Sequence, residues 1–272
     1  MGQKSQILKL TDEVEALDLA LYLPDERTLV LADVHVGYEA ALLREGTLLP
    51  KRHLQALSDR LNRILEKLEV SAENPLNRVI VNGDLSHQFG FLTYQESLDS
   101  FHLLNRLDAL CNEIILLKGN HDGNLMPLTE SGKRVLLYDS YQLDSVLFMH
   151  GNREMEEIPE SIKTIVIGHE HPAIGLRDRV TGRVELYKCF LVGEYRGVKL
   201  IVQPSFNPLA HGSDLTRESC LSPLLDERQI LSFEVYPVSD DGIVIRFGLL
   251  GDLIQSEEEL GARIGQHPDP KY

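Results

Sequence analysis

Five short apolar runs in this chain each end at a polar motif, and this pairing restricts the fold more than any other feature. The runs are residues 28–32, 79–81, 114–117, 146–149 and 164–167. Continuous Val, Ile and Leu runs of this length are typical of strands that are covered on both faces of a sheet. Because ligands in such sheets gather beyond the carboxyl ends of the strands, we expect the five motifs to meet at one edge.

Amphipathic segments separate the first three runs. Their apolar positions recur at helical spacing with charged residues between them. The stripes are Leu54, Leu57, Leu61, Ile64, Leu65 and Leu68 within residues 51–69, and Tyr94, Leu98, Phe101, Leu104 and Leu107 within residues 94–110. The order strand, helix, strand, helix, strand predicts parallel pairing with right-handed crossovers.

The pattern changes after residue 172, where short apolar segments alternate with turn signals. Residues 184–192 and 198–202 flank a Gly-Glu-Tyr-Arg-Gly loop, which predicts a hairpin. Residues 230–235 and 243–247 flank Asp240-Asp241-Gly242, which predicts another. We expect these hairpins to add antiparallel strands to a second sheet. Since no repeat or linker interrupts the chain, the sequence predicts one α/β domain over residues 1–255 and a short helix or disordered tail over 256–272.

Composition limits the class of protein. Apolar residues make up 43% of the 272 positions and charged residues 25%, which is usual for soluble globular proteins. No apolar run approaches the ~20 residues that span a bilayer, and the N-terminus lacks the apolar core of a secretory signal. We therefore expect a cytoplasmic protein that does not enter a membrane. Cys111, Cys189 and Cys220 have no Cys-x-x-Cys spacing, which favours buried thiols in a reducing compartment.

The five motifs carry side chains that bind metal ions. In chain order they are Asp33-Val34-His35, Gly83-Asp84, Gly119-Asn120-His121-Asp122, His150-Gly151 and Gly168-His169-Glu170-His171. Each motif is weak alone, because such short patterns arise by chance or in ordinary turns. Their conjunction at five strand ends is specific, since it delivers seven oxygen or nitrogen donors to one place. A donor set of this kind suits a two-metal hydrolytic centre.

The residue types suggest a role for each donor. Asp84 is the natural bridge between two cations, because a bridging ligand needs charge and two oxygens. Asp33, His35 and His171 would complete one site, and Asn120, His150 and His169 would complete the other. Donors without thiolate favour Mn²⁺, Fe or Zn²⁺ over Ca²⁺, and of these we expect two Mn²⁺ ions. His121 is left outside the ligand set and is the candidate to protonate a leaving oxygen, with Asp122 or another carboxylate orienting its ring.

In this order, the motifs resemble those of the calcineurin-like metallophosphoesterases. Residues 33–39, followed by Arg44-Glu45-Gly46, resemble the opening motif of the SbcD-related phosphoesterases of archaea and their bacterial DNA ligase- or helicase-associated relatives. The run Pro204-Ser205-Phe206-Asn207-Pro208-Leu209 resembles their late signature. The similarity extends from about residue 5 to about residue 215. It implies a four-layer α/β/β/α sandwich of two mixed sheets, a dinuclear site with the ligands assigned above, and His121 as the proton donor.

One departure from related phosphatases bears on the substrate. The phosphoprotein phosphatases of this superfamily continue Gly-Asp into an Asp-Arg-Gly run whose arginine grips phosphate. Here residues 83–89 read Gly-Asp-Leu-Ser-His-Gln-Phe, which favours diester chemistry. His87 either supports the ligands or faces the substrate, and the sequence leaves both open. Arg44, Arg196 and His211 are either near the site or on solvated loops.

The sequence therefore predicts a dinuclear metal-dependent phosphoesterase. We expect a phosphodiesterase or nuclease that hydrolyses nucleic acid or nucleotides through a metal-bridged hydroxide, with Asp84 and His121 as the catalytic residues. Two alternatives stay open: a phosphomonoesterase for a small metabolite, and a repair-complex subunit with little activity alone. A net charge of −15 opposes an independent grip on nucleic acid. Two explanations stay open: a partner such as a DNA ligase or helicase binds the nucleic acid, or the substrate is small. The sequence does not fix the oligomeric state.

Overall fold

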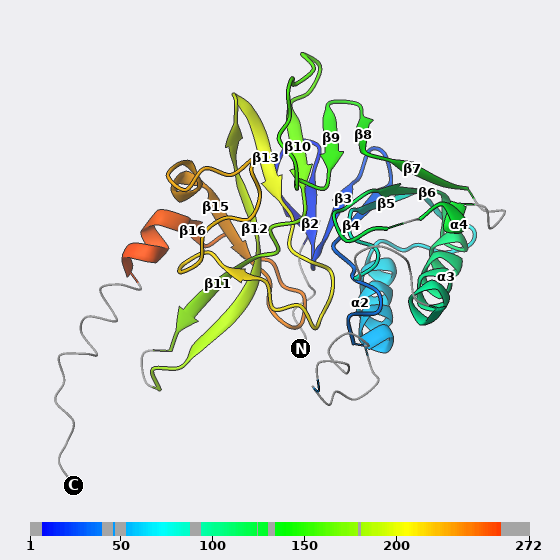
Figure 1. The fold of residues 1–272 in the computed structure, drawn as a ribbon, viewed down its shortest axis with the longest axis horizontal. Coiled ribbons are helices and arrows are strands. Elements are labelled where there is room, and N and C mark those ends of the chain that lie inside the picture. The colour runs from blue at the N-terminus through cyan, green and yellow to red at the C-terminus, as the bar shows by residue number, and fades with distance from the viewer. Residues whose placement is uncertain are drawn as a thin grey trace, which may run out of the picture.

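Two mixed β-sheets form the centre of the fold (Figure 1). The computed structural model describes residues 7–39, 46, 53–87, 94–123, 125–129, 134–178 and 181–256. Within these ranges no helix is both long and apolar enough to cross a bilayer. The predicted α/β class with two mixed sheets is confirmed.

The first sheet has the strand order β1-β2-β3-β4-β5-β6-β7. Its strands are β1 (Leu8–Lys9), β2 (Glu15–Leu17), β3 (Ala20–Leu23), β4 (Thr28–Ala32), β5 (Leu76–Asn82), β6 (Cys111–Leu117) and β7 (Val135–Tyr138). Strands β4 to β7 are parallel, as predicted for the first three runs. The antiparallel strands β1 to β3 were not predicted, because segments of two to four residues are too short to show a periodicity.

Helices cover the outer face of this first sheet (Figure 1). They are α2 (His53–Lys67), α3 (Tyr94–Asp108) and the short α4 (Met126–Thr129). In α2 the predicted stripe packs inward through Leu57, Leu61 and Ile64, all of which are buried. The stripe of α3 is likewise buried at Leu104 and Leu107.

The second sheet has the order β14-β11-β12-β13-β10-β9-β8, with β15 paired to β12 and β16 paired to β15. Its strands are β8 (Ser140–Leu143), β9 (Val146–Met149), β10 (Thr164–Ile167), β11 (Pro172–Arg177), β12 (Val184–Tyr195), β13 (Val198–Val202), β14 (Ser213–Asp214), β15 (Glu234–Pro237) and β16 (Gly248–Leu249). Strands β9, β10 and β13 are parallel. Strands β12 and β13 form the first predicted hairpin, in which Tyr195 pairs with Val198.

The second predicted hairpin is only partly correct. The 3₁₀ helix η1 (Gln229–Ser232) replaces the expected start of the first arm. The second arm makes an isolated bridge, Val238 to Val244, before the two-residue strand β16. The reason lies in the burial of Ile230 and Phe233, which are three residues apart and therefore need a helical turn to face the sheet together. The Phe233 ring packs against Gly193, where an added Cβ would lie 2.1 Å from the ring.

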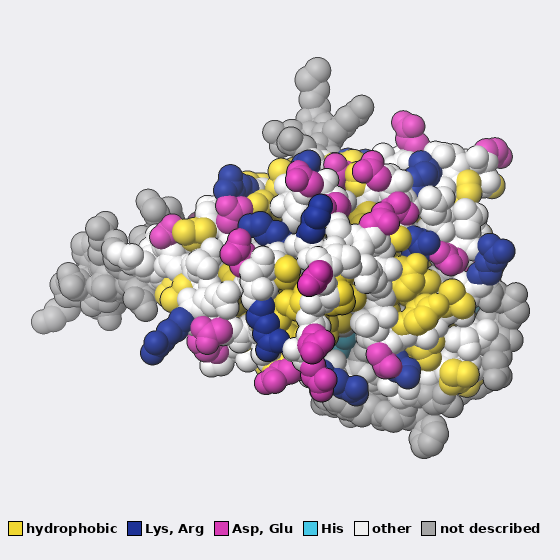
Figure 2. All heavy atoms as spheres, turned by 90° about the horizontal axis from the view of Figure 1, so that it is seen from above, with side chains coloured by type: hydrophobic (Ala, Val, Ile, Leu, Met, Phe, Trp, Pro, Cys, Tyr) yellow, Lys and Arg dark blue, Asp and Glu magenta, His cyan; other side chains and the backbone are white. Residues whose placement is uncertain are grey.

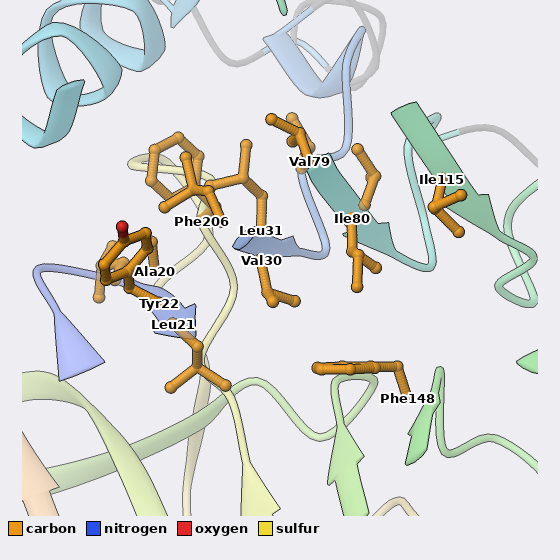
Figure 3. Close-up of a cluster of buried hydrophobic side chains, with 14 of the residues drawn as sticks. Ala20, Leu21, Tyr22, Val30, Leu31, Val79, Ile80, Ile115, Phe148 and Phe206 are labelled. Atoms are coloured by element: carbon orange, nitrogen blue, oxygen red, sulfur yellow. The ribbon is translucent and has the colours of Figure 1, made fainter. Parts of the chain in front are cut away.

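Two apolar layers hold the sheets in place. Between the sheets, Val30 and Ile80 point toward Phe148, whereas Leu31 and Val79 point to the opposite face of the first sheet (Figure 3). This alternation follows from the two-residue period of a strand. The second layer covers the outer face of the second sheet and includes Phe233, the residue that follows η1. Residues 250–256 are helical, while the rest of the predicted tail, 257–272, lies outside the described residues.

Candidate active site

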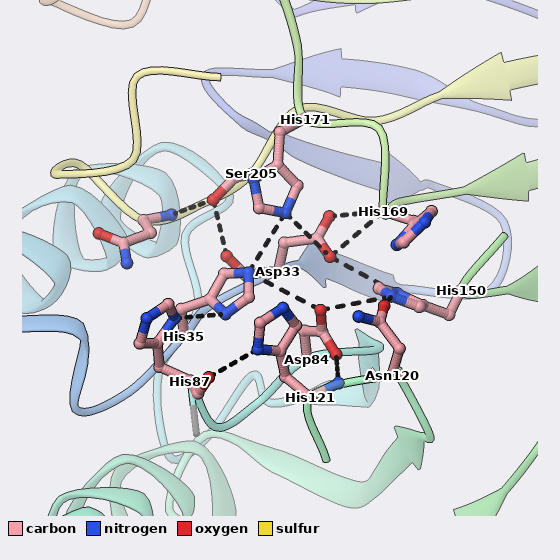
Figure 4. A network of polar contacts seen from close by, with 12 residues as sticks. Asp33, His35, Asp84, His87, Asn120, His121, His150, His169, His171 and Ser205 are labelled. Atoms are coloured by element: carbon pink, nitrogen blue, oxygen red, sulfur yellow. Dashed lines mark hydrogen bonds and ion pairs between the residues drawn. The ribbon is translucent and has the colours of Figure 1, made fainter. Parts of the chain in front are cut away.

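All five motifs lie at the carboxyl ends of parallel strands (Figure 4). The strands and the donors that follow them are β4 with Asp33 and His35, β5 with Asp84, β6 with Asn120, β9 with His150, and β10 with His169 and His171. The register places the strand ends level, since Ala32 pairs with Asn82 and Asn82 with Leu117. The structure therefore brings all seven predicted donors together between the two sheets.

The backbone bends sharply at these strand ends. Five of the donors have left-handed φ angles: Asp33 (50°), His35 (46°), Asp84 (45°), His169 (64°) and His171 (48°). For residues other than glycine this conformation costs about 1–3 kcal/mol each, and it concentrates at functional sites. Glycines allow the bends to pack closely. A Cβ at Gly83 would lie 2.1 Å from Nδ1 of His150, and one at Gly119 would lie 2.0 Å from Oδ1 of Asp84.

The first half of the cluster joins β4 to β10. The Nε2 atoms of His35 and His171 are 3.2 Å apart, and Nε2 of His171 is 3.4 Å from Oδ1 of Asp33. The Asp33 carboxylate also accepts a hydrogen bond from the backbone N–H of His169, at 3.0 Å to Oδ2. Asp33 is fully buried, so its position is fixed by these contacts.

The second half of the cluster surrounds His150. Its Nε2 atom lies 2.9 Å from Oδ1 of Asn120 and 3.4 Å from Oδ2 of Asp84. The ring of His169 is 4.9 Å away, centre to centre. Oδ2 of Asp84 also faces Nε2 of His35 at 3.8 Å. Asp84 therefore lies between the two halves, with one oxygen directed at both.

Burial and charge place most of these groups in metal-binding protonation states. Burial lowers the pKa of His35 to about 3, and the neighbouring His171 adds to this effect. Burial also lowers the pKa of His169 to about 4. Burial alone would raise the pKa of Asp84, but the hydrogen bond and charge of His150 lower it to about 2. At neutral pH these groups are neutral imidazoles and an ionised carboxylate, which are the forms that bind cations.

The donor spacing fits bound cations. Two ligands at right angles around an ion, each about 2.1 Å from it, lie about 3 Å apart. The neighbouring donor atoms described above are separated by 3.2–3.8 Å, with the His150–Asn120 pair closer at 2.9 Å. Moreover, Nδ1 of His150 is buried and has no hydrogen-bond partner among the described residues. The groups Asp33-His35-His171 and Asp33-Asp84-His150 each have the geometry to share an ion.

His121 lies at the rim of the same cluster. Its Nδ1 atom is 2.6 Å from the backbone carbonyl oxygen of His87, so Nδ1 donates and Nε2 is the atom that can exchange a proton. The rings of His121 and His87 are stacked 5.4 Å apart, and His121 is 5.1 Å from the ring of His35. His87 also lies beside the cluster, because its Nδ1 atom is 3.4 Å from Nδ1 of His35.

The predicted orienting role of Asp122 is wrong. Its carboxylate accepts hydrogen bonds from the backbone N–H groups of Ser86 and Gly119, both at 3.0 Å. It therefore ties the turn after β6 to the turn after β5. The His121 ring is oriented instead by the carbonyl group of His87, a backbone contact that side-chain types in the sequence do not reveal.

Two buried supports behind the cluster have no role in the sequence-based prediction. Ser205 donates from Oγ to the backbone oxygen of Asp33 at 2.7 Å. Glu170 is fully buried between two histidine donors, and its Oε2 accepts from the backbone N–H groups of Leu221 and Ser222 at 2.8 Å each. The hydroxyl of Ser222 then donates to the oxygen of Gly151 at 2.6 Å, which connects the β10 end to the β9 end.

The remaining candidates lie elsewhere. Arg196 is exposed and donates to the backbone oxygens of Met155 and Glu156, not to the cluster. His211 is exposed and lines a separate cavity. Arg44 lies outside the described residues.

Comparison with known proteins agrees with this geometry. The family model described as calcineurin-like phosphoesterase matches residues 26–230. The fold is similar to the crystal structure of the Pseudomonas putida nuclease MPE, with a TM-score of 0.58 and 20% identity, over 89% of this chain and 100% of that one. The E. coli phosphoesterase YfcE is more distant, with a TM-score of 0.41 and 13% identity over 82% and 98% of the two chains. No curated protein sequence matches the chain significantly. A match over most of the sequence, together with the donors at its strand ends, shows that the chain belongs to the calcineurin-like phosphoesterase family.

Proposed function

We propose that this protein is a metal-dependent phosphodiesterase that acts on nucleic acid or on a nucleotide. The observation that carries the proposal is the position of Asp84, whose Oδ2 faces His35 at 3.8 Å and His150 at 3.4 Å. Two-metal hydrolysis of phosphate esters needs cations about 3.5–4 Å apart. A buried carboxylate between the two halves of the cluster is suited to hold two cations at that separation.

Each half of the cluster would hold one divalent ion. Asp33, His35, His171 and Asp84 would hold the first, and Asp84, Asn120, His150 and His169 the second. Oxygen and imidazole donors without thiolate suit Mn²⁺, with Fe and Zn²⁺ as alternatives. When bound, the ions would supply Lewis acidity to a phosphate ester.

The residues of the chain would position the ester and move protons. The hydrogen bond from His121 Nδ1 to the His87 carbonyl fixes the ring beside His35. A protonated His121 could then donate from Nε2 to the leaving oxygen, a role that general acids fill with rate effects of about 10²–10⁴. His87, stacked on the same ring, would face the substrate.

The charge of the site supports a diester in preference to a monoester. A diester carries one negative charge, whereas a monoester at neutral pH carries about two. The described contacts of the seven donors come from Asp, Asn and His side chains and from backbone groups, with no Lys or Arg among them. The residues after Asp84 are Leu85, Ser86 and His87, without an arginine. The similar fold in Pseudomonas putida belongs to a protein named as a nuclease, which agrees with this choice.

The test compares two esters of the same leaving group. The protein is stripped of metal with a chelator, restored with Mn²⁺, and assayed with bis(p-nitrophenyl) phosphate and p-nitrophenyl phosphate. We expect turnover of the diester that depends on Mn²⁺ and is lost in Asp84→Asn. The matched control is Asp12→Asn. It removes the charge of an exposed carboxylate that pairs with Lys9 and does not belong to the metal cluster.

Two outcomes would replace this proposal. Preferred hydrolysis of the monoester would identify a phosphomonoesterase for a small metabolite. Binding of Mn²⁺ without turnover of either ester would identify a subunit that needs a partner, such as a DNA ligase or helicase. The acidic balance of the chain, with 42 Asp and Glu against 27 Lys and Arg, is the observation that keeps a partner or a small substrate in view.

A further inference from the structure

A lysine outside the metal cluster is fastened to the segment that supports it. Lys188 lies on β12, where its side chain is half-buried. It donates to the backbone oxygen of Ser205 at 2.8 Å and also to that of Asn207. An ammonium group that is partly withdrawn from water needs other partners for its N–H donors, and these two carbonyl groups supply them.

The segment that Lys188 binds is in turn attached to the end of β4. The backbone N–H of Phe206 donates to the oxygen of Ala32 at 2.8 Å. The Ser205 hydroxyl donates to the oxygen of Asp33 at 2.7 Å and accepts from the N–H of Asn207 at 3.2 Å. All three segment residues are buried. A continuous chain of hydrogen bonds therefore runs from the ammonium of Lys188 to the backbone of Asp33.

Asp33 has a strained backbone conformation. Its φ angle is 50°, a left-handed value that an aspartate keeps only when its surroundings hold it. Its carboxylate contacts donors in both halves of the cluster, with Oδ1 at 3.4 Å from His171 and 3.5 Å from His150. A small movement of Asp33 would therefore disturb both ion sites.

From these contacts we infer that Lys188 is a positioning residue for the metal centre: by fixing the carbonyl groups of Ser205 and Asn207, it holds Asp33 in its ligand geometry. The inference rests on the proposed function for the identity of Asp33 as a ligand. Without Lys188, two buried carbonyl oxygens lose a donor, which is unfavourable, and the segment shifts to find replacements. Burial and the nearby Arg60 guanidinium lower the pKa of Lys188 to about 7. A neutral amine still has two N–H donors, so the clamp persists when the proton is lost.

A cavity beside Lys188 makes this role testable. The cavity has a volume of about 530 Å³, and its lining includes Lys188, Arg60, Tyr187, Pro208 and His211. Lys188→Ala would extend it toward Ser205 and Asn207. A small primary amine such as ethylammonium can then enter and donate to the two carbonyl groups. Lys188→Met keeps most of the side-chain volume without a donor, so it leaves no room for the amine.

The experiment uses two readouts, one of which needs no metal. Amide hydrogen exchange in the metal-free protein follows the N–H groups of Phe206 and His169, which donate to Ala32 and to the Asp33 carboxylate. Electron paramagnetic resonance of free Mn²⁺ gives the affinity for the ion. We expect both variants to exchange these amides faster and to bind Mn²⁺ about 10–100-fold more weakly, as changes behind metal ligands commonly do. Ethylammonium should restore both properties in Lys188→Ala but not in Lys188→Met.

The controls separate this inference from the proposed function. Lys199→Ala removes an exposed lysine of β13 and should change neither readout. Sodium chloride at the same ionic strength should not replace ethylammonium. Wild-type exchange of Phe206 and His169 in both variants would overturn the inference, as would wild-type behaviour of Lys188→Met, which would assign the effect to packing. If the unmodified protein binds no Mn²⁺, the proposed function fails, while the exchange data still decide whether Lys188 positions Asp33.

Discussion

Asp84 is held by groups from three different strand ends. Its Oδ1 accepts from the backbone N–H of His121 at 2.8 Å, and its Oδ2 faces His35 and His150. Asp84→Asn keeps the size and the oxygen acceptor but removes the charge that two cations would share. We expect Mn²⁺ stoichiometry to fall from two to one or fewer per chain, and turnover to fall by about 10²–10³-fold or more. Equilibrium dialysis and the diester assay check this, and an unchanged stoichiometry of two would contradict the bridging role.

His121 belongs to the proton-transfer step in our proposal. His121→Gln keeps a polar side chain of similar reach but cannot act as an acid. Turnover of an alkyl or nucleotide diester should fall by about 10²–10⁴-fold. Turnover of a nitrophenyl diester should fall much less, because nitrophenolate leaves without protonation. Equal losses on both substrates would argue for a structural role, and His102→Gln, at an exposed position of α3, is the matched control.

The charge state of His150 predicts a pH dependence of metal binding. Burial alone would lower the pKa of His150, but its hydrogen bond to Asp84 and the charge of Asp33 raise it to about 8 in the metal-free protein. A cation must therefore displace a proton at pH 7, and apparent Mn²⁺ affinity should rise up to about tenfold per pH unit until pH 8, then level off. Calorimetry in buffers of different ionisation enthalpy should show about one proton released per protein chain at pH 7 and none above pH 9. Proton release that does not change with pH would contradict this assignment.

At the residue scale, the sequence predicted which residues gather at the strand ends but not the contacts that support them. Asp33, Asp84 and His150 are visible because polar residues of these types directly follow apolar runs. The contacts of Asp122, Glu170 and Lys188 are not visible, because each depends on backbone groups that only the folded chain brings near. Backbone N–H and C=O groups are the same in nearly every residue, so a sequence pattern does not show which of them a side chain will contact.

At the scale of elements, parallel strands were predicted better than the segments around them. Strands β4, β9 and β10 begin and end where the apolar runs do, since strands buried on both faces need unbroken apolar residues. The prediction of a strand from residue 230 was wrong over η1, because the apolar Ile230 and, just after η1, Phe233 fit either a short strand or a helical turn. The close packing of Phe233 on Gly193 in the neighbouring strand favours the helical turn.

The loop that covers Glu170 provides a prediction at the same scale. Ser222 is buried, and its hydroxyl links this loop to Gly151, the residue after His150. Ser222→Ala leaves the Gly151 oxygen without this donor and should lower the free energy of unfolding by about 1–3 kcal/mol. We expect a several-fold loss of Mn²⁺ affinity as the β9 end loosens. Ser232→Ala, at an exposed position of η1, should change neither urea unfolding nor Mn²⁺ binding, and similar effects of the two variants would show that the loop does not support the site.

At the scale of the whole molecule, charge limits how nucleic acid can be bound. The net charge is −15, and Figure 2 shows Lys and Arg side chains interspersed with Asp and Glu across the face in view. Each phosphate neutralised by a Lys or Arg contributes about −0.9 to the slope of log affinity against log salt concentration on duplex DNA. A surface that neutralises few phosphates should therefore bind weakly and respond little to salt.

We expect this protein, loaded with Ca²⁺ to slow hydrolysis, to bind a short DNA duplex with a dissociation constant above about 10 µM and a salt slope smaller in magnitude than about 2. Fluorescence anisotropy at salt concentrations between about 50 and 200 mM measures the dissociation constant and the salt slope. Diester turnover on a dinucleotide should meanwhile depend little on salt, because its recognition would lie at the metal cluster. Tight binding with a slope near −6 would contradict the proposal of a small substrate or a partner-supplied grip, because it would require a track of about six or seven phosphate contacts on this chain alone.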